Sequence, residues 1–141
     1  MNYNLERFTE AQSLSYETAL GEIKNGHKTS HWIWYIFPQL KELGISYNSK
    51  YYGIEGLQEA AAYLAHPVLG ARLKEICEAL LELETNNPDE VMGGIDSRKL
   101  CSSMTLFAEA DSYDSVFGMV LKKYYNGKND LYTVNLLKNK N

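Results

Sequence analysis

The chain has 141 residues, a formal net charge of −4 and 45% hydrophobic residues, which are ordinary values for one globular domain. The negative charge argues against an electrostatic nucleic-acid or anionic-membrane surface. The longest apolar run, from Trp32 to Pro38, is far shorter than the roughly 20 residues of a membrane-spanning helix. The N-terminus lacks the order of a signal peptide, and Cys77 and Cys101 have no Cys-x-x-Cys spacing. We therefore expect a single domain over 1–141, in the cytoplasm, with reduced thiols.

The first predicted helix covers residues 5–25, where apolar residues recur at helical spacing before Gly26 provides a stop signal. A second helix is predicted over 57–65, because the residue before Pro67 is disfavoured in the helical conformation. Proline suits the first position of a helix, so the next one is predicted over 67–83, with one apolar stripe.

Side chains that can cap helices divide the second half of the chain. Asn, Ser and Asp at such positions accept hydrogen bonds from free N–H groups of the first turn. They predict a short helix after Asn87 that is broken at Gly93-Gly94, a helix from Asp96 to Ala110, one from Ser115 to Tyr125, and a last one from Asp130 to about Leu137.

Residues 28–39 form the most unusual segment, because two tryptophans, a tyrosine and a phenylalanine lie within six residues of it. The composition of Trp32–Phe37 suits a strand, but a buried strand needs partners and no other segment reads as one. Thr29 or Ser30 can cap a short helix here, which Pro38 would end. We therefore predict an all-α fold with about seven helices, several of them short.

The polar ends of this segment form the first candidate site. A helix capped by Ser30 would leave N–H groups of its first turn available to an anion, with Lys28 and His31 beside them. Trp32 and Trp34 are interpreted first as core residues and second as surfaces on which a ligand stacks. Gln39 could orient a base or an amide of a ligand.

A second candidate lies in the predicted helix after Asp96, which contains Lys99, Ser102, Ser103 and Thr105. Hydroxyl residues are poor choices for a helix interior, and Asp96, Lys99 and Ser103 fall on one side of the helix. The pattern has two interpretations, which the sequence leaves open. The hydroxyls either permit close helix packing and bond to the preceding turn, or they face a ligand.

Metal binding and nucleophilic catalysis receive little support. His27 and His31 are four residues apart, but no third ligand lies at a suitable spacing, so we predict no metal site. Ser30 and His31 cannot act as nucleophile and base on one helix, because neighbouring residues do not face each other. Cys101 is interpreted as an inert cysteine rather than as a thiol activated by Lys99. The cofactor, if any, stays open.

Four blocks of the chain resemble the bacterial and fungal family called domain of unknown function 1810. The resemblance implies a compact, mainly helical single domain without an established activity; a calpastatin label on some members does not fit a packed domain. The family usually has Met where this chain has Ile33, and often a capping serine where it has Gly56. The blocks are Arg7-Phe8-x-x-Ala11-Gln12, Lys28-x-Ser30-His31-Trp32-x-Trp34-x-x-Phe37-Pro38-Gln39, Ala62-Tyr63-Leu64-x-His66-Pro67-x-Leu69-Gly70-x-Arg72-Leu73 and Lys99-Leu100-x-Ser102-Ser103-Met104-Thr105-Leu106-Phe107.

Three functional hypotheses follow. The first is a site, with or without catalysis, for a phosphate-bearing or other small anionic ligand such as a nucleotide, held by cations and stacked on aromatic rings. The second is an aromatic docking surface for a protein, and the third is a purely structural role for the motifs. The candidate ligand-binding residues are Lys28, Ser30, His31, Trp32, Trp34, Gln39, Arg72, Lys99, Ser102 and Ser103. Their convergence on one concavity would favour the first hypothesis. The oligomeric state is not predicted.

Overall fold

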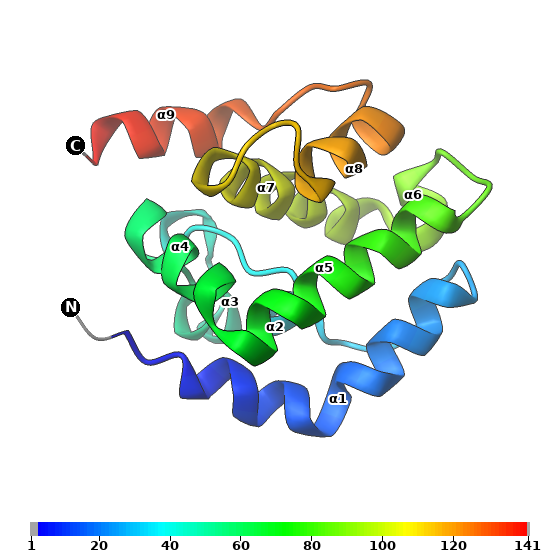
Figure 1. Ribbon diagram of the computed structural model, residues 1–141, viewed down its shortest axis with the longest axis horizontal. Helices are drawn as coiled ribbons and strands as arrows, with labels where there is room; N and C mark the ends of the chain where they lie inside the picture. The colour runs from blue at the N-terminus through cyan, green and yellow to red at the C-terminus, as the bar shows by residue number, and fades with distance from the viewer. Residues whose placement is uncertain (1–2, 141) are drawn as a thin grey trace.

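The computed structural model describes residues 3–140, and over this range the chain is built from helices without a β-strand (Figure 1). The predicted all-α class is confirmed, although the described residues contain nine α-helices rather than about seven. The α-helices are α1 (Glu6–Lys24), α2 (Ile33–Ile36), α3 (Tyr47–Tyr51), α4 (Leu57–Ala65), α5 (Pro67–Glu82), α6 (Pro88–Met92), α7 (Gly94–Ala110), α8 (Val116–Tyr125) and α9 (Leu131–Asn139), with a 3₁₀ turn, η1, at Lys41–Leu43.

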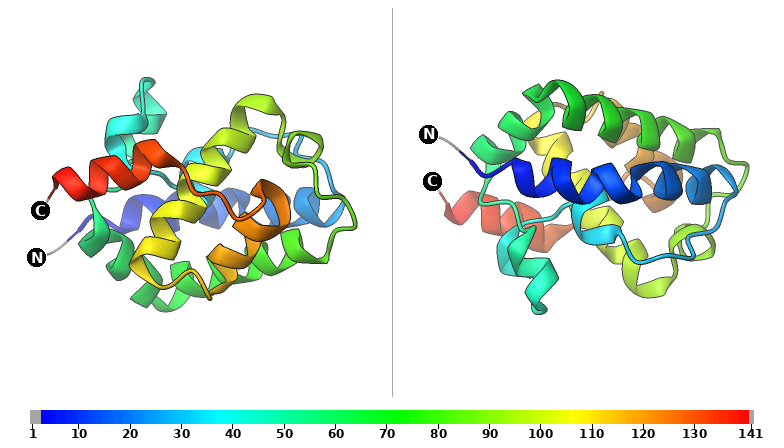
Figure 2. Two further views of the ribbon diagram at one scale, coloured as in Figure 1. Left: turned by 90° about the horizontal axis from the view of Figure 1, so that it is seen from above. Right: turned by 90° about the horizontal axis from the view of Figure 1, so that it is seen from below.

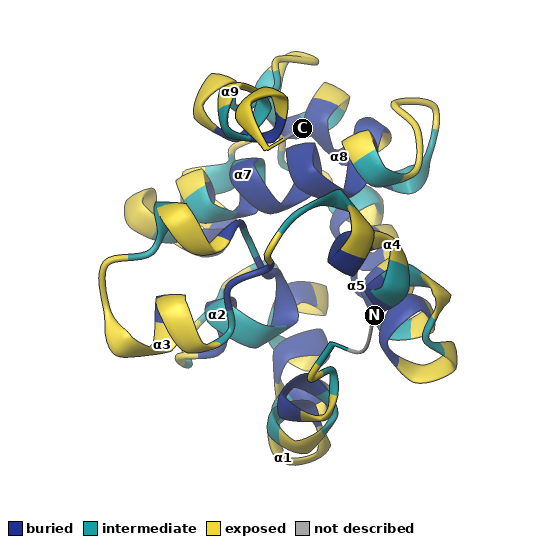
Figure 3. Ribbon diagram, turned by 90° about the vertical axis from the view of Figure 1, so that its left-hand side faces the viewer, coloured by how far each residue is buried: buried dark blue, intermediate teal, exposed yellow. Residues whose placement is uncertain are grey.

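Helix α7 lies at the centre of the packing, where it contacts α2, α4, α6, α8 and α9. Helix α5 packs against α1, α4 and α8, and α1 and α9 lie on opposite sides of the molecule (Figures 1 and 2). Buried faces of these helices point inward around one core, whereas α3 presents a largely exposed side to solvent (Figure 3). A residue on α7 is therefore held by neighbours on several sides.

Four aromatic rings connect the helices through the core. The ring centroids of Phe8 and Tyr63 are 5.1 Å apart, those of Tyr63 and Phe107 are 5.3 Å apart, and those of Phe107 and Phe117 are 5.7 Å apart. Each of these side chains is fully buried, and they come from α1, α4, α7 and α8. Such ring pairs stabilise beyond their area burial, so this chain of rings fixes four helices relative to one another.

Most predicted helix ends are confirmed because local side chains satisfy the end groups. His66 Nδ1 accepts from the backbone N–H groups of α5, which begins at Pro67 as expected. The capping roles of three further side chains are confirmed by their hydrogen bonds to the first turns of α6, α8 and α9, namely Asn87, Ser115 and Asp130. Helix α9 continues to Asn139, two residues beyond the predicted end.

The predicted cap of α7 is wrong. Helix α7 begins at Gly94, so Gly93 rather than Asp96 is at its N-cap position, with a positive φ of 85° that suits glycine. Asp96 lies within the first turn, where a carboxylate is favourable beside free N–H groups. Its side chain is consequently available for contacts outside the helix.

The Trp32–Phe37 segment contains the short helix α2, as predicted, and not a strand. Further along the chain, Leu40 and Ile54 form an isolated β-bridge. The turn η1 and helix α3 lie between these two residues and were not predicted, because their sequence has no clear apolar period.

Candidate functional site

The loop before α2 is held by the carboxylate of Glu22 on α1. Oε1 accepts from the backbone N–H groups of Thr29 at 2.8 Å and Ser30 at 2.9 Å. It also accepts from Trp32 Nε1 at 2.9 Å, while Oε2 accepts from the Ser30 hydroxyl at 2.5 Å. Burial disfavours the charged carboxylate, but these hydrogen bonds outweigh it and lower the pKa of Glu22 to about 2.

This arrangement differs from the predicted capping at the start of α2. Trp32 occupies the N-cap position, without a side-chain cap, so the predicted capping by Thr29 or Ser30 is wrong. The backbone N–H groups of Thr29 and Ser30 donate to the Glu22 carboxylate. His31 beside them is exposed to solvent.

A shared carboxylate connects this loop to α7. Lys28 Nζ lies 2.8 Å from Asp96 Oδ2 and only 6% of its side chain is exposed. Lys99 Nζ lies 3.8 Å from Asp96 Oδ1, and 28% of its side chain is exposed. Asp96 is therefore held closely by Lys28, whereas Lys99 is the longer-range and more accessible partner.

The two tryptophans have different surroundings. Trp32 is 1% exposed and belongs to the core, and Lys28 Nζ lies 4.9 Å from its ring centroid. Trp34 is half-buried, and Lys99 Nζ lies 6.0 Å from its ring centroid. Trp34 Nε1 is buried and has no hydrogen-bond partner among the described residues, whereas Trp32 Nε1 donates to Glu22.

Lys99 and Gln39 belong to two adjoining concavities. The smaller one, here the inner crevice, has a volume of about 10 Å³, roughly the space of one water-sized group. It is lined by Ile33, Trp34, Phe37, Gln39, Ser49, Tyr52 and Lys99.

The larger concavity, here the α7–α9 groove, has a volume of about 760 Å³, which is within the range of ligand sites. Its lining includes Arg98 and Lys99 as cations and Asp130 as the carboxylate. Four of its apolar side chains are strongly exposed: Ile45 (91%), Ile95 (76%), Leu131 (69%) and Tyr132 (75%). The remaining lining residues are Gln39, Leu43, Ser97, Cys101, Ser102, Tyr125 and Asn129.

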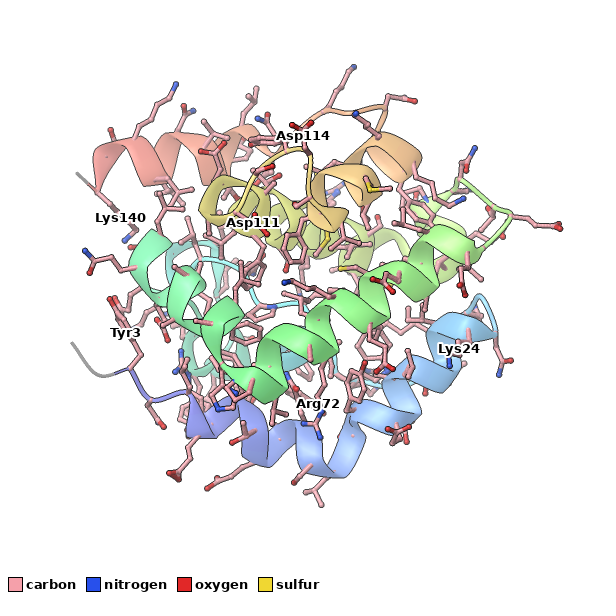
Figure 4. All side chains as sticks on the ribbon, in the orientation of Figure 1. Tyr3, Lys24, Arg72, Asp111, Asp114 and Lys140 are labelled. Carbon is pink, nitrogen blue, oxygen red and sulfur yellow. The ribbon has the colours of Figure 1, made fainter. Side chains whose placement is uncertain are left out.

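The groove and the crevice together contain four of the ten predicted site residues, namely Trp34, Gln39, Lys99 and Ser102. Lys28, Ser30 and Trp32 cluster around Glu22 and Asp96 and line neither concavity. Arg72 lies between α5 and α1, where its Nη1 donates to Gln12 at 3.5 Å (Figure 4). The ten residues thus do not share one concavity.

The hydroxyls of α7 have mainly structural partners. Ser102 Oγ is within hydrogen-bond distance of the Arg98 carbonyl and of Asp130 Oδ2, at 3.1 and 3.0 Å. Thr105 Oγ1 donates to the Cys101 carbonyl and accepts from the Asp130 N–H, both at 2.8 Å. These bonds fix the start of α9 on α7. Ser103 is fully buried, and its hydroxyl has no partner among residues 3–140.

Cys101 lines the groove but is not an activated thiol. Burial, and then the nearby Asp130 carboxylate, raise the pKa of Cys101 to about 11. The thiol is therefore protonated at neutral pH and is a weak nucleophile, which fits an inert cysteine.

The described residues give no sign of a metal centre or a membrane span. Between Tyr3 and Lys140, no group of three or more His, Cys, Asp and Glu side chains could hold a metal ion. No helix in the same range has both the length and the apolarity needed to cross a membrane.

Two parts of this site escaped prediction. Glu22 has no local sequence signal, because its four donors come from a loop that folds back on α1. The four exposed apolar residues of the groove, here the apolar rim, were only weakly indicated by the sequence. Ile45 and Ile95 each follow a glycine and belong to no apolar stripe, which is the one hint that they are exposed. The packing of α9 on α7 brings Ile95 near Leu131 and Tyr132, and the loop between η1 and α3 adds Ile45 to the same groove.

These features define a small all-α protein whose central helix borders a ligand-sized surface groove. The family model described as protein of unknown function (DUF1810) matches residues 2–137. The chain therefore belongs to this family, as its sequence blocks predicted. It is also similar to the crystal structure of the conserved hypothetical protein Rv1873 from Mycobacterium tuberculosis, with 43% identity, a TM-score of 0.94, and coverage of 96% of this chain and 97% of that chain. No curated protein matches it.

Proposed function

We propose that the α7–α9 groove binds a small organic anion that has an apolar body. Lys99 carries the proposal, because it borders both the groove and the inner crevice and is only loosely paired with Asp96, at 3.8 Å. An external anion can therefore take Lys99 while Lys28 keeps Asp96 neutralised at 2.8 Å.

The charge of the groove supports an anionic ligand. Arg98 and Lys99 are its cations, while Oδ2 of Asp130 is already engaged with Ser102 and Thr133. A hydrogen bond to a charged group contributes about 1.5–3 kcal/mol, so two such bonds plus apolar burial along the rim would give about micromolar affinity. Phosphate-bearing ligands, nucleotides among them, and organic acids belong to this class.

The proposal assigns binding and no reaction. The described residues that line the groove include no histidine, and the thiol of Cys101 is protonated at neutral pH because its pKa is raised to about 11. We place the protein in the cytoplasm, where Cys77 and Cys101, which form no disulfide in the structure, would stay reduced.

Calorimetric titration of a panel of nucleotides and aromatic acids tests the proposal on three proteins. Wild type is compared with Lys99→Gln, which removes the charge but keeps a long polar side chain. Arg72→Ala is the matched control, since Arg72 lies outside the groove. We expect Lys99→Gln to weaken binding at least tenfold and Arg72→Ala to leave it unchanged. No binding by any anion, or equal loss in both variants, would refute the proposal.

A protein-binding role is the second candidate, favoured by the exposed apolar rim. Ile45, Ile95, Leu131 and Tyr132 are each more than two-thirds exposed around one groove, and clustered exposed apolar side chains mark interaction surfaces. If the rim contacts another protein, Tyr132→Ser should abolish complex formation in affinity capture while anion binding persists. A capture profile identical to wild type would dismiss this candidate.

A further inference from the structure

A side chain that lines the inner crevice has a hydrogen-bond donor that the fold leaves unused. Trp34 lines this crevice, and its buried Nε1–H has no acceptor among the described residues. The indole N–H of Trp32, two residues earlier, is by contrast satisfied by Glu22 at 2.9 Å. A buried donor without a partner is destabilising, so an acceptor supplied by a ligand would be favourable there.

The other polar groups of the crevice suit a negatively charged acceptor. The Lys99 ammonium lies 6.0 Å from the centroid of the Trp34 ring, and the Gln39 side chain lines the crevice as well. Both residues also line the α7–α9 groove, so a ligand in the groove can extend one group into the crevice.

The size of the crevice separates classes of anion. Its volume of about 10 Å³ accommodates a single oxygen-sized group. A planar carboxylate can place one oxygen inside and keep the other at the mouth, near the Lys99 ammonium. A phosphate monoester shares about two negative charges among three tetrahedral oxygens, so with one oxygen in the crevice two more would need partners at its mouth.

We infer that the ligand of the α7–α9 groove is a monocarboxylate whose apolar body lies along the exposed rim and whose carboxylate enters the inner crevice. One carboxylate oxygen accepts from Trp34 Nε1 and the carboxylate pairs with Lys99. This inference rests on the proposed function and narrows its ligand class from small anions in general to organic acids.

The test compares three probes of matched shape: phenylacetate, phenyl phosphate and the uncharged 2-phenylethanol. Their dissociation constants are measured by NMR titration on ¹⁵N-labelled protein. The chain has two tryptophans and therefore two indole N–H signals, which Trp34→Phe assigns. We expect phenylacetate to bind at least tenfold more tightly than the other two. It should also move the Trp34 indole proton downfield, as a new hydrogen bond requires, and leave that of Trp32 in place.

The outcomes distinguish a failure of the carboxylate inference from a failure of the proposed function. If phenyl phosphate binds as tightly as phenylacetate through Lys99, or if phenylacetate binds without moving the Trp34 signal, the carboxylate inference is overturned and the anion site stands. If neither anion binds and only 2-phenylethanol does, or none of the three, both the inference and the proposed function fail. The indole shift is measured on the wild-type protein, so the test does not depend on the folding of Trp34→Phe.

Discussion

Replacing Glu22 by Gln should destabilise the protein at neutral pH and much less in acid. Hydrogen bonds from the loop before α2 lower the pKa of Glu22 from 4.5 to about 2. This lowering of the pKa by about 2.5 corresponds to about 3.4 kcal/mol, and because the carboxylate is partly solvated, screening reduces the contribution to about 1–2 kcal/mol. Because the folded-state pKa is the lower one, this stabilisation is complete above about pH 5 and is lost as the pH falls towards 2.

Urea unfolding followed by far-UV circular dichroism at pH 7 and pH 3 measures this difference. We expect Glu22→Gln to reduce the free energy of unfolding by about 1–2 kcal/mol at pH 7, with more than half of that difference gone at pH 3. Glu10→Gln, at an exposed position of the same helix, is the control and should change stability by less than about 0.5 kcal/mol. A Glu22→Gln effect of equal size at both pH values would refute the assigned role of the carboxylate.

Three further predictions concern packing and the thiols. A Cβ on Gly118 would lie 1.8 Å from a carbonyl oxygen of the preceding loop, so Gly118→Ala should cost about 3 kcal/mol in urea unfolding. Gly21→Ala, at a position on α1 with open space around it, should raise the free energy of unfolding by about 0.5–1 kcal/mol. Similar effects of the two substitutions would contradict the close approach at Gly118. Ser103→Ala removes a buried hydroxyl that has no partner among residues 3–140, so thermal melting should show stability unchanged or higher by up to about 1 kcal/mol. A clear loss of stability would contradict the absence of a partner. Iodoacetamide labelling, followed by mass spectrometry, should be slow for Cys101 at pH 7 and become faster as the pH rises to about 11. Cys77 is fully buried and should be labelled only after unfolding. Rapid labelling of Cys101 at pH 7 would contradict its raised pKa.

Local chemistry explains why so many helix ends could be predicted. Asn87, Ser115 and Asp130 act on N–H groups two or three residues ahead, so the sequence contains both partners of each bond. The start of α7 was misplaced because Asp96 is a good capping residue by type, yet Gly93 has the backbone conformation that the turn requires. Propensity alone does not reveal which of two nearby candidates the chain uses.

The candidate site was only partly predictable, because its residues are joined by contacts distant in sequence. Asp96 and Lys99, which the helical period places on one side of α7, do lie beside Lys28 and Trp34. Ser103, predicted on the same side, is fully buried, and its hydroxyl has no partner among residues 3–140. The carboxylate that binds the Ser30 loop was not predictable, since Glu22 looks like any charged residue at the edge of an amphipathic helix.

The sharing of Asp96 by two lysines has a consequence for how a ligand could enter and leave. When a cation is tied to a single carboxylate, an incoming anion must strand that carboxylate in a poorly solvated place, and exchange is slow and costly. Here Lys28 stays 2.8 Å from Asp96 on the far side, so Lys99 can turn from one negative partner to another without leaving an isolated charge. For the proposed ligand, the pair of lysines would make binding an exchange of ion-pair partners between near-equivalent arrangements, which favours rapid and reversible binding.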